Sequence, residues 1–209
     1  GGIMAAPDKF SIVVKGRGGH AAQPHRTVDP ISIGAQIVTN LQLIASRNAD
    51  PIRSIVVSVT RFQAGSSHNI IPNEALIAGT VRTLDETVRD MAEARIKQIA
   101  EGIAAANGAE AEAVYERYCP VTVNHADETD HAIRIAREVA GDKNVDPDVD
   151  PSMAGEDFSY MLNQRPGAFI FLGNGETAGL HNPGYDFNDE AIAYGLSYWV
   201  KLAEQRLGS

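Results

Sequence analysis

The sequence predicts an α/β fold in two parts, an α+β unit followed by a part that mixes helices with one buried strand. Over the first part, apolar residues recur in the order strand, helix, strand, strand, helix, strand. That order is typical of a split β-α-β arrangement, with an antiparallel sheet covered on one face by two helices. The second part holds too few strands to make a stable domain by itself, so it is expected to need a partner.

Four segments of the first part have the alternation of half-buried strands. In the first, Phe10, Ile12 and Val14 recur at period two, which places their side chains on one face. Glycine-rich or polar loops bound the other three. The four predicted strands cover residues 8–16, 54–62, 75–83 and 109–117.

Two helices with clear start signals connect these strands. Asp29 precedes Pro30, an N-cap carboxylate before a proline at the first helical position, and the helix is predicted to run to about Ser46. Asp85 caps the second helix, and Asn107-Gly108 stops it. The uncovered sheet face and the two long sheet edges favour association with another chain.

The second part contains fewer recognisable elements. A helix is expected around 131–140, followed by an acidic loop over 141–153 and the segment AGEDFSYML. The run GAFIFLGNG, 167–175, is almost continuously apolar between glycines, which is typical of a strand buried on both faces. Residues 189–207 have the pattern of an amphipathic final helix.

Composition excludes several classes of partner. The chain of 209 residues carries a formal net charge of -9 with scattered Lys and Arg, so a nucleic-acid partner is not expected. No run is long and apolar enough for a membrane span, and the first residues lack the features of a secretory signal. The single cysteine, Cys119, fits a reducing cytoplasm and is expected to be an unreactive structural thiol.

A glycine-rich loop carries the first candidate site residue. The segment GRGGHAAQPH packs three glycines before His20, and such a turn can project one imidazole and free N–H groups toward a ligand. The alternative is a tight turn with an exposed histidine. The loop does not have the spacing of either phosphate-binding pattern.

Three more polar candidates lie farther along the chain. Asn69, next to His68, can orient a carbonyl through its amide, and Arg82 offers a planar fork to a carboxylate; both are otherwise ordinary surface residues. Glu156, followed by Asp157, is placed to cap the short helix that follows it, which is the alternative to a role at a site.

His181 is the candidate metal ligand. It lies in LHNPGYDFNDE, between an apolar run and the last helix, where Pro183 and Gly184 restrain the loop. An imidazole on such a loop is a good ligand, with Asp186 or Asn188 as groups that orient it. One histidine without an H-x-x-x-H or C-x-x-C companion is equally compatible with a structural role.

Taken together and in this order, the motifs resemble the M20 metallopeptidases and amidohydrolases. The segments are GRGGHAAQPH, LQLIASR, SVTRFQAG, HNIIPNEALIAGTVRT, AGEDF and LHNPGYDFNDE, and they span essentially the whole chain. The branch that they resemble is that of hippurate hydrolases and N-acyl-amino-acid amidohydrolases. The resemblance implies a ferredoxin-like dimerisation lid over 7–117, with 1–6 and 118–209 forming the C-terminal part of an α/β zinc-peptidase-like catalytic domain.

The resemblance also implies roles for the candidate residues. His181 would bind one of two divalent metal ions per site, Zn, Mn, Co or Ni. His20 would stabilise the oxyanion in the site of a partner subunit, while Asn69, Arg82 and Glu156 would hold a small N-acyl amino acid. The expected reaction is amide hydrolysis by metal-activated water in a homodimer formed through the lid.

One departure from the family weakens the expectation of a complete site. The first half of the catalytic domain, with the family's cysteine-histidine segment, paired glutamates and one further histidine, is not found in these residues. Metal binding and activity are therefore expected to be weak or absent in this chain alone, as in a fragment of a longer parent. The alternative function is a dimerisation or ligand-binding module without catalysis.

Overall fold

The computed structural model describes residues 1–208, and these form two compact units. The first, called the sheet unit, comprises residues 2–122 and 151–160. The second, called the helical unit, comprises Gly1, 123–150 and the residues from 161 onward. Each unit is described by itself.

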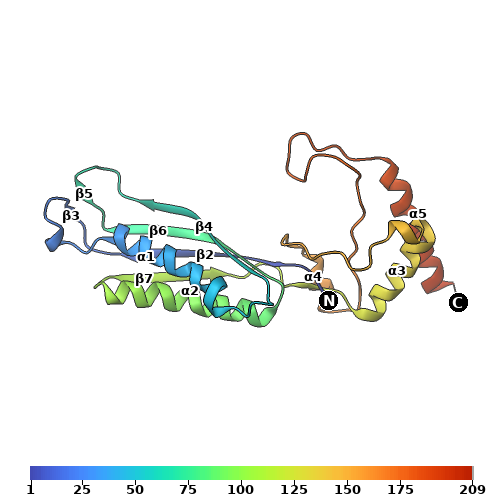
Figure 1. The fold of residues 1–209 in the computed structure, drawn as a ribbon, viewed down its shortest axis with the longest axis horizontal. Coiled ribbons are helices and arrows are strands. Elements are labelled where there is room, and N and C mark those ends of the chain that lie inside the picture. The colour runs from blue at the N-terminus through green and yellow to red at the C-terminus, as the bar shows by residue number, and fades with distance from the viewer. Residues whose placement is uncertain (209) are drawn as a thin grey trace. The chain divides into compact units, whose positions relative to one another are not determined.

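The sheet unit is built on a four-stranded antiparallel sheet with the strand order β4-β6-β2-β7. The chain order of its main elements is β-α-β-β-α-β, as predicted, and both helices lie along the sheet (Figure 1). The six elements are β2 (Ala6–Lys15), α1 (Pro30–Leu43), β4 (Ile55–Ala64), β6 (Glu74–Thr83), α2 (Glu86–Ala106) and β7 (Glu110–Glu116).

Strand alternation places the core on one face of this sheet. Phe10, Ile12 and Val14 of β2 point to the face that the helices cover, and they are almost completely buried. Their partners in the core come from both helices and from β4 and β6: Ile33, Ile37, Leu41, Val57, Ile77, Val81, Ala92, Ile96 and Ile99. The predicted cover of one face by two helices is therefore confirmed.

The predicted helix signals of the sheet unit are also confirmed. The Asp29 side chain accepts a hydrogen bond from the Ile31 N–H, and Asp85 accepts from Thr87 and Val88. Gly108 follows α2 with a φ of 71°, a conformation that glycine adopts without strain. At its C-terminus α1 passes into a π-helical segment, η2 (Ile44–Asn48).

Smaller elements complete the sheet unit. β3 (Gly19–His20) pairs with β5 (Ile70–Ile71) in a two-stranded sheet, and η1 (Pro24–Arg26) follows β3. Another two-stranded sheet is formed by β1 (Gly2–Met4) and β8 (Thr122–Val123).

A buried ion pair crosses the sheet unit from β2 to α2. Arg89 donates to both carboxylate oxygens of Asp8, at 2.7 and 2.6 Å, and the two side chains are 5% and 1% exposed. The Tyr115 hydroxyl and the Tyr118 N–H donate to the same carboxylate. Burial by itself raises the pKa of Asp8, but these hydrogen bonds, with that of Arg89 foremost, hold the pKa below its usual range.

The helical unit consists mainly of two helices that lie side by side (Figure 1). They are α3 (Ala126–Ala140) and α5 (Glu190–Leu207); the remaining helical segments of the second part are η3 (Asp142–Asn144) and α4 (Phe158–Leu162). The core between α3 and α5 is small: Ala132, Ile135 and Tyr198 are its buried residues. The Lys201–Glu138 ion pair, with an N–O distance of 2.8 Å, joins the same helices at their surface.

Two predictions for the second part need correction. The helix expected around 131–140 begins earlier, at Ala126, with Asp127 and Glu128 in its first turn, where carboxylates favour the helix dipole. The strand predicted over 167–175 is absent from the described structure, and Phe171 and Leu172 are 46% and 54% exposed. The Asn124 side chain instead bonds the Phe169 N–H and C=O, and the His125 N–H donates to the Gly167 carbonyl oxygen.

Candidate functional site

The predicted site residues fall in three places. His20 and Asn69 lie together on the β3 and β5 loops, Arg82 and Glu156 lie elsewhere in the sheet unit, and His181 belongs to the helical unit. No helix among residues 1–208 is long and apolar enough to span a membrane.

His20 is exposed, and its ring is oriented by the backbone. The Ala22 N–H donates to the imidazole Nδ1 at 3.1 Å. In a neutral imidazole the proton then resides on Nε2, so that this atom is a donor. The loop of His20 therefore presents one N–H donor to the solvent.

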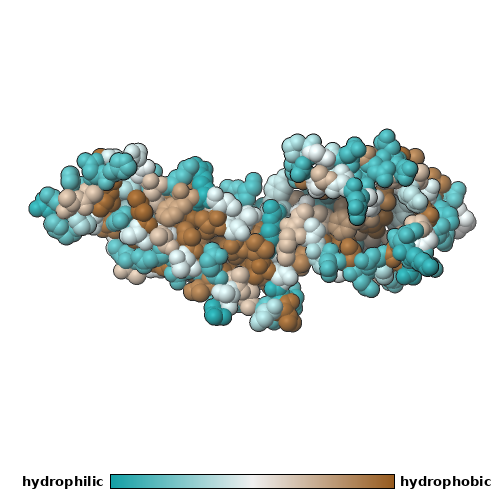
Figure 2. All heavy atoms as spheres, turned by 45° about the horizontal axis from the view of Figure 1, so that its top comes forward, coloured by the Kyte–Doolittle hydropathy of each residue, from teal (hydrophilic) through white to brown (hydrophobic). Residues whose placement is uncertain are grey.

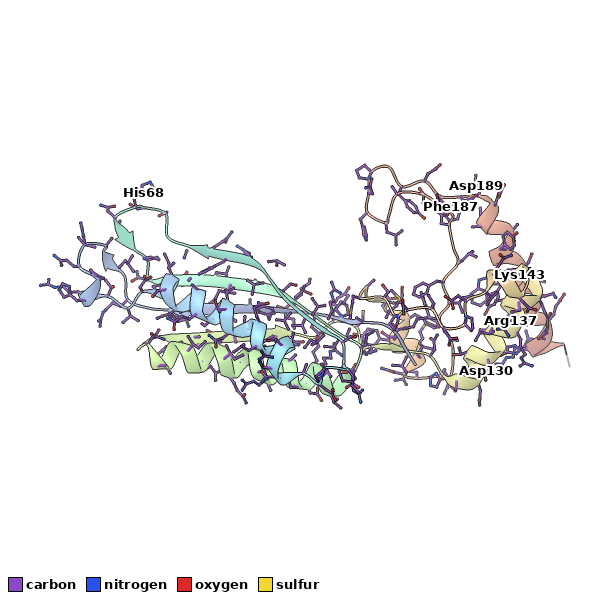
Figure 3. The ribbon with its side chains drawn as sticks, in the orientation of Figure 1. His68, Asp130, Arg137, Lys143, Phe187 and Asp189 are labelled. Atoms are coloured by element: carbon purple, nitrogen blue, oxygen red, sulfur yellow. The ribbon has the colours of Figure 1, made fainter. Side chains whose placement is uncertain are left out.

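Asn69 lies next to His20 because the two loops pair. His20 is opposite Ile70, and the Ala21 N–H donates to the Asn69 carbonyl oxygen at 3.0 Å. The Ser67 hydroxyl donates to the Asn69 Oδ1 at 2.7 Å, which leaves the amide nitrogen for another partner. Figure 3 shows the neighbouring His68 at the outer turn of this loop. The backbone pairing of the two loops thus places His20 and Asn69 on neighbouring segments.

Arg82 lies at the other end of β6. It is opposite Pro7 and Val56, on the sheet face that the helices do not cover, and among residues 1–208 it has no ion pair. Strands rise by about 3.3 Å per residue, so the stretch from Glu74 to Arg82 spans roughly 26 Å. The structure therefore does not bring Arg82 to His20 and Asn69.

Glu156 lies in a loop that packs near the same end of the sheet. A Cβ on Gly155 would lie 2.3 Å from the Cγ of Pro7, the residue opposite Arg82, so only glycine permits this approach. The Glu156 carboxylate accepts from the Phe158 N–H at 3.2 Å, and its carbonyl oxygen accepts from the Ser159 hydroxyl. The capping role considered for Glu156 is therefore present in the structure.

His181 lies in the long loop before α5, whose end is marked by Phe187 and Asp189 in Figure 3. Its φ of 65° is uncommon for a residue with a side chain and is compatible with a tight functional turn. The Asn174 side chain ties the loop by bonding the Asp186 carbonyl oxygen and the Asn188 N–H.

The expectation that Asp186 or Asn188 orients His181 is not met in the described structure. The Asn188 Oδ1 accepts from the Glu190 N–H at the start of α5, and no hydrogen bond joins either residue to the His181 ring within residues 1–208. The reason is local, since a side chain close to a helix N-terminus satisfies that helix first.

A two-metal centre does not fit the side chains that the structure describes. Within residues 1–208, no group of three or more His, Cys, Asp and Glu side chains could hold a metal ion. His181 alone supplies one nitrogen, whereas metal sites in proteins need several ligands. Cys119 is buried, and burial raises the pKa of its thiol, so it has the environment of a structural cysteine.

Sequence patterns gave no role to two residues that organise these loops. Asn73 lies inside the segment HNIIPNEALIAGTVRT, and Asn174 lies between Gly173 and Gly175. Asparagine in a turn commonly bonds nearby backbone groups, and this is the signal by which both residues could be found.

The chain belongs to the peptidase family M20/M25/M40, whose pattern it matches over residues 3–205. It is 42% identical over 203 residues to the hippurate hydrolase of Campylobacter jejuni, and this match covers 97% of the chain and 53% of that protein. It is also 38% identical over 203 residues to an N-acetylcysteine deacetylase of Bacillus subtilis, again over 97% of the chain and 53% of the relative.

The fold agrees with this assignment. The Bacillus subtilis YXEP protein, described as a dinuclear metal binding peptidase from the M20 family, superimposes with a TM-score of 0.77 at 34% identity. The superposition covers 100% of the chain and 52% of that protein. The chain therefore spans about half the length of the relatives it matches. Its fold class, α/β with open sheets, is the predicted one.

Proposed function

We propose that the protein acts in the metal-dependent hydrolysis of the amide bond of N-acyl amino acids or related small conjugates, with hippurate as the type of substrate. The observation that carries this proposal is the 42% identity to a hippurate hydrolase across 97% of the chain. A deacetylase of N-acetylcysteine at 38% identity supports the same substrate class. Residues 7–117 would form the dimerisation lid, and residues 1–6 and 118–209 would belong to the catalytic domain.

In this proposal His20 and Asn69 act as hydrogen-bond donors. When water attacks the amide carbon, negative charge develops on the carbonyl oxygen, and a donor aimed at that oxygen lowers the barrier. The ring orientation of His20, with the Ala22 N–H on Nδ1, favours this role for Nε2. The Asn69 amide nitrogen lies on the adjacent loop and would contact the same part of the substrate.

Arg82 would bind the carboxylate of the amino acid. Its guanidinium offers two parallel N–H donors, and the absence of an ion pair for it within residues 1–208 leaves these donors for a ligand. The Glu156 loop contacts Pro7 beside it and would border the same substrate.

The separation of His20 and Asn69 from Arg82 within one sheet unit supports a homodimer. His20 and Asn69 lie beyond the Glu74 end of β6, and Arg82 lies about 26 Å along the strand from Glu74, which is longer than an N-acyl amino acid. One small substrate can therefore contact all three residues only when they come from two copies of the chain. Lid residues of one subunit would then complete the site of the other.

The metal ions of the proposal, two per site and drawn from Zn, Mn, Co or Ni, need more ligands than these residues supply. His181 is the one candidate ligand that the motifs provide, and its loop places it outside any cluster of acidic or histidine side chains within residues 1–208. A cytoplasmic location is proposed from the single buried free thiol.

Turnover tests this proposal directly. The longer parent protein, which is expected to supply the missing metal ligands, is assayed on N-benzoylglycine and on N-acetyl amino acids, with added Mn²⁺ or Zn²⁺ and with a chelator. Metal-dependent release of the free amino acid is expected, and His181→Ala is expected to abolish it. Failure to hydrolyse any of these amides under either metal contradicts the proposal.

Mixed dimers test the cross-subunit role of His20. A His20→Ala subunit is combined with a His181→Ala subunit, each of which is inactive by itself in this proposal. Recovery of activity toward a quarter to a half of the wild-type value is expected in the mixture, since one of the two sites in a mixed dimer then has both histidines. Mixtures that regain no activity show that His20 does not act across subunits.

A second candidate function is a dimerisation or ligand-binding module without catalysis. The lack of a metal-ligand cluster within residues 1–208 favours it for this chain by itself. Light scattering and calorimetric titration with Zn²⁺ separate the two functions. A dimer that does not bind Zn²⁺ supports the module for this chain by itself, whereas tight binding of two ions per chain contradicts the expectation that its metal site is incomplete.

A further inference from the structure

The loops that carry His20 and Asn69 are joined by very little regular structure. β3 and β5 pair over two positions, Gly19 with Ile71 and His20 with Ile70. A two-stranded pairing of this length is marginal in water, and glycine increases the conformational entropy that ordering a loop must overcome. The Ala21–Asn69 hydrogen bond extends this pairing on the His20 side, and a further contact reaches the loop on the side of Gly16 and Gly18.

Asn73 makes that contact from the start of β6. Its Oδ1 accepts from the Gly18 N–H at 2.9 Å, and its backbone oxygen accepts from the Gly16 N–H at 2.8 Å. The next residue, Glu74, pairs with Lys15 in the main sheet. Asn73 therefore links the last residue pair of β2 and β6, Lys15 with Glu74, to the loop that leads to His20.

The packing around the loop shows why its glycines are required. A Cβ on Gly18 would lie 2.5 Å from the Ile71 carbonyl oxygen and 3.0 Å from the Asn73 Oδ1. A Cβ on Gly16 would lie 2.2 Å from the Val28 carbonyl oxygen. The close approach at Gly18 accompanies the Asn73 hydrogen bond, whereas the approach at Gly16 accompanies the bridge between Arg17 and Val28.

The consequence for the site is indirect. Asn73 contacts neither the His20 ring nor the Asn69 amide, and its two bonds end on Gly16 and Gly18. Gly18 is two residues from His20. The His20 carbonyl oxygen accepts from the Gln23 N–H, and the next N–H, that of Ala21, donates to the Asn69 carbonyl oxygen. Fixing Gly18 therefore fixes the direction in which the imidazole leaves the loop.

We propose that Asn73 is a positioning residue that holds the glycine-rich loop on the β5 loop, so that His20 and Asn69 present their donors side by side. The link to catalysis rests on the proposed function, whereas the link to loop order does not. The position of such a donor matters because a displacement of about 1 Å can lower the rate of the catalysed reaction about a hundredfold.

The experiment compares Asn73→Ala and Asn73→Asp with Glu74→Ala as a matched control. The alanine variant removes the Oδ1 acceptor, the aspartate variant keeps an oxygen there, and the control removes the adjacent exposed side chain. Amide order parameters and hydrogen exchange are measured for Gly16, Gly18 and His20 in the whole chain. Core amides of β2 and β6 report in the same spectra whether each variant is folded.

In Asn73→Ala the order parameters of the loop amides are expected to fall from about 0.85 to below 0.6, with at least tenfold faster exchange of the Gly18 amide. Asn73→Asp and Glu74→Ala are expected to remain like wild type. Turnover of N-benzoylglycine by the active protein should fall at least tenfold in kcat for Asn73→Ala, with a smaller change in KM, and should recover in Asn73→Asp.

The outcomes separate the positioning role of Asn73 from the proposed role of His20 in hydrolysis. An ordered loop in Asn73→Ala, with a protected Gly18 amide, overturns the positioning role whatever the activity. A disordered loop with unchanged turnover supports the positioning role and overturns the proposed part of His20 in hydrolysis. An equal loss of order in Asn73→Asp shows that the Oδ1 acceptor is not what holds the loop, and this also overturns the positioning role.

Discussion

The two units differ in how completely they bury their apolar side chains. In the sheet unit, Ile12, Ile37 and Ile77 are completely buried between two helices and the sheet. In the helical unit, Leu196 and Trp199 of α5 are each 63% exposed, although α5 is the main packing partner of α3. Brown apolar residues are visible among teal polar ones at the surface in Figure 2.

This difference shows that helical periodicity does not by itself predict burial. One side of α5 packs on α3 through Tyr198 and Leu202. A second apolar row remains exposed. Its residues recur at spacings of three or four and then seven or eight positions along the helix: Ile192, Leu196, Trp199, Val200 and Leu207. The sheet unit buries a large core between its helices and its sheet, whereas the helical unit buries only a small core among the described residues.

The largest effect is expected from removing Asp8. Asp8→Ala removes the buried carboxylate partner of Arg89, which keeps only the half-exposed Glu86 carboxylate and the Cys119 carbonyl oxygen, and it leaves the Tyr118 N–H without its acceptor. Breaking a buried pair in this way costs about 3–5 kcal/mol of unfolding free energy. Urea denaturation, followed by exchange of β2 and β6 amides, measures the loss.

Lys15→Ala is the matched control for Asp8→Ala. It breaks the exposed Lys15–Glu112 pair on the same sheet, and exposed pairs contribute at most about 1 kcal/mol. Equal losses of unfolding free energy in the two variants would show that the buried Asp8–Arg89 pair stabilises the sheet unit no more than an exposed pair does.

The next largest effect compares the cores of the two units. Ile37→Ala creates a cavity in the sheet unit and is expected to cost about 2–5 kcal/mol. Leu196→Ala removes a side chain of similar size from the exposed row of α5, and a change of at most about 0.5 kcal/mol is expected. Thermal and urea unfolding of both variants measure the two values. A loss above about 2 kcal/mol for Leu196→Ala would mean that the helical unit buries this residue.

A smaller effect is expected from pH, because acid only protonates the Asp8 carboxylate and does not remove its side chain. The pKa of Asp8 is lower in the folded protein than its usual value of about 3.9. A lowered folded pKa contributes stability that is present above the unfolded pKa and is lost as the pH falls through the folded pKa. Unfolding free energies between pH 6 and pH 2 should therefore decrease below about pH 4.

The variant Asp8→Ala serves as the reference for this titration. Its unfolding free energy should decrease less steeply below pH 4, because the titrating carboxylate is absent. Parallel curves for wild type and Asp8→Ala would assign the acid sensitivity to other groups.

The smallest effect compares two helix starts. Asp85 accepts from two backbone N–H groups at the start of α2, so Asp85→Ala should cost about 1 kcal/mol. Asp189 occupies the same position before α5 without a side-chain hydrogen bond to the helix, so Asp189→Ala should cost only a few tenths of a kcal/mol. Thermal unfolding of the two variants tests the contrast. A larger cost for Asp189→Ala would reverse it.

The sequence predicted the sheet unit well because its signals are local. Period-two alternation in β2, the Asp29 and Asp85 caps and Gly108 after α2 each act within a few residues of their own position. The apolar run at 167–175 misled the prediction for the opposite reason. A strand needs neighbouring strands, and in the described helical unit no strand pairs with 167–175, where the Asn124 side chain bonds the backbone of Phe169.

The candidate site residues show the same difference between local sequence signals and contacts made by the folded chain. The order of the motifs by itself identified the family and selected His20, Asn69, Arg82, Glu156 and His181 as candidates. Only the tertiary structure decided that His20 and Asn69 share one end of the sheet while Arg82 lies at the other, and that Asn73 holds the loop of His20. The physical reason is that caps and periodicity act over a few residues, whereas strand register and loop contacts join residues about fifty positions apart.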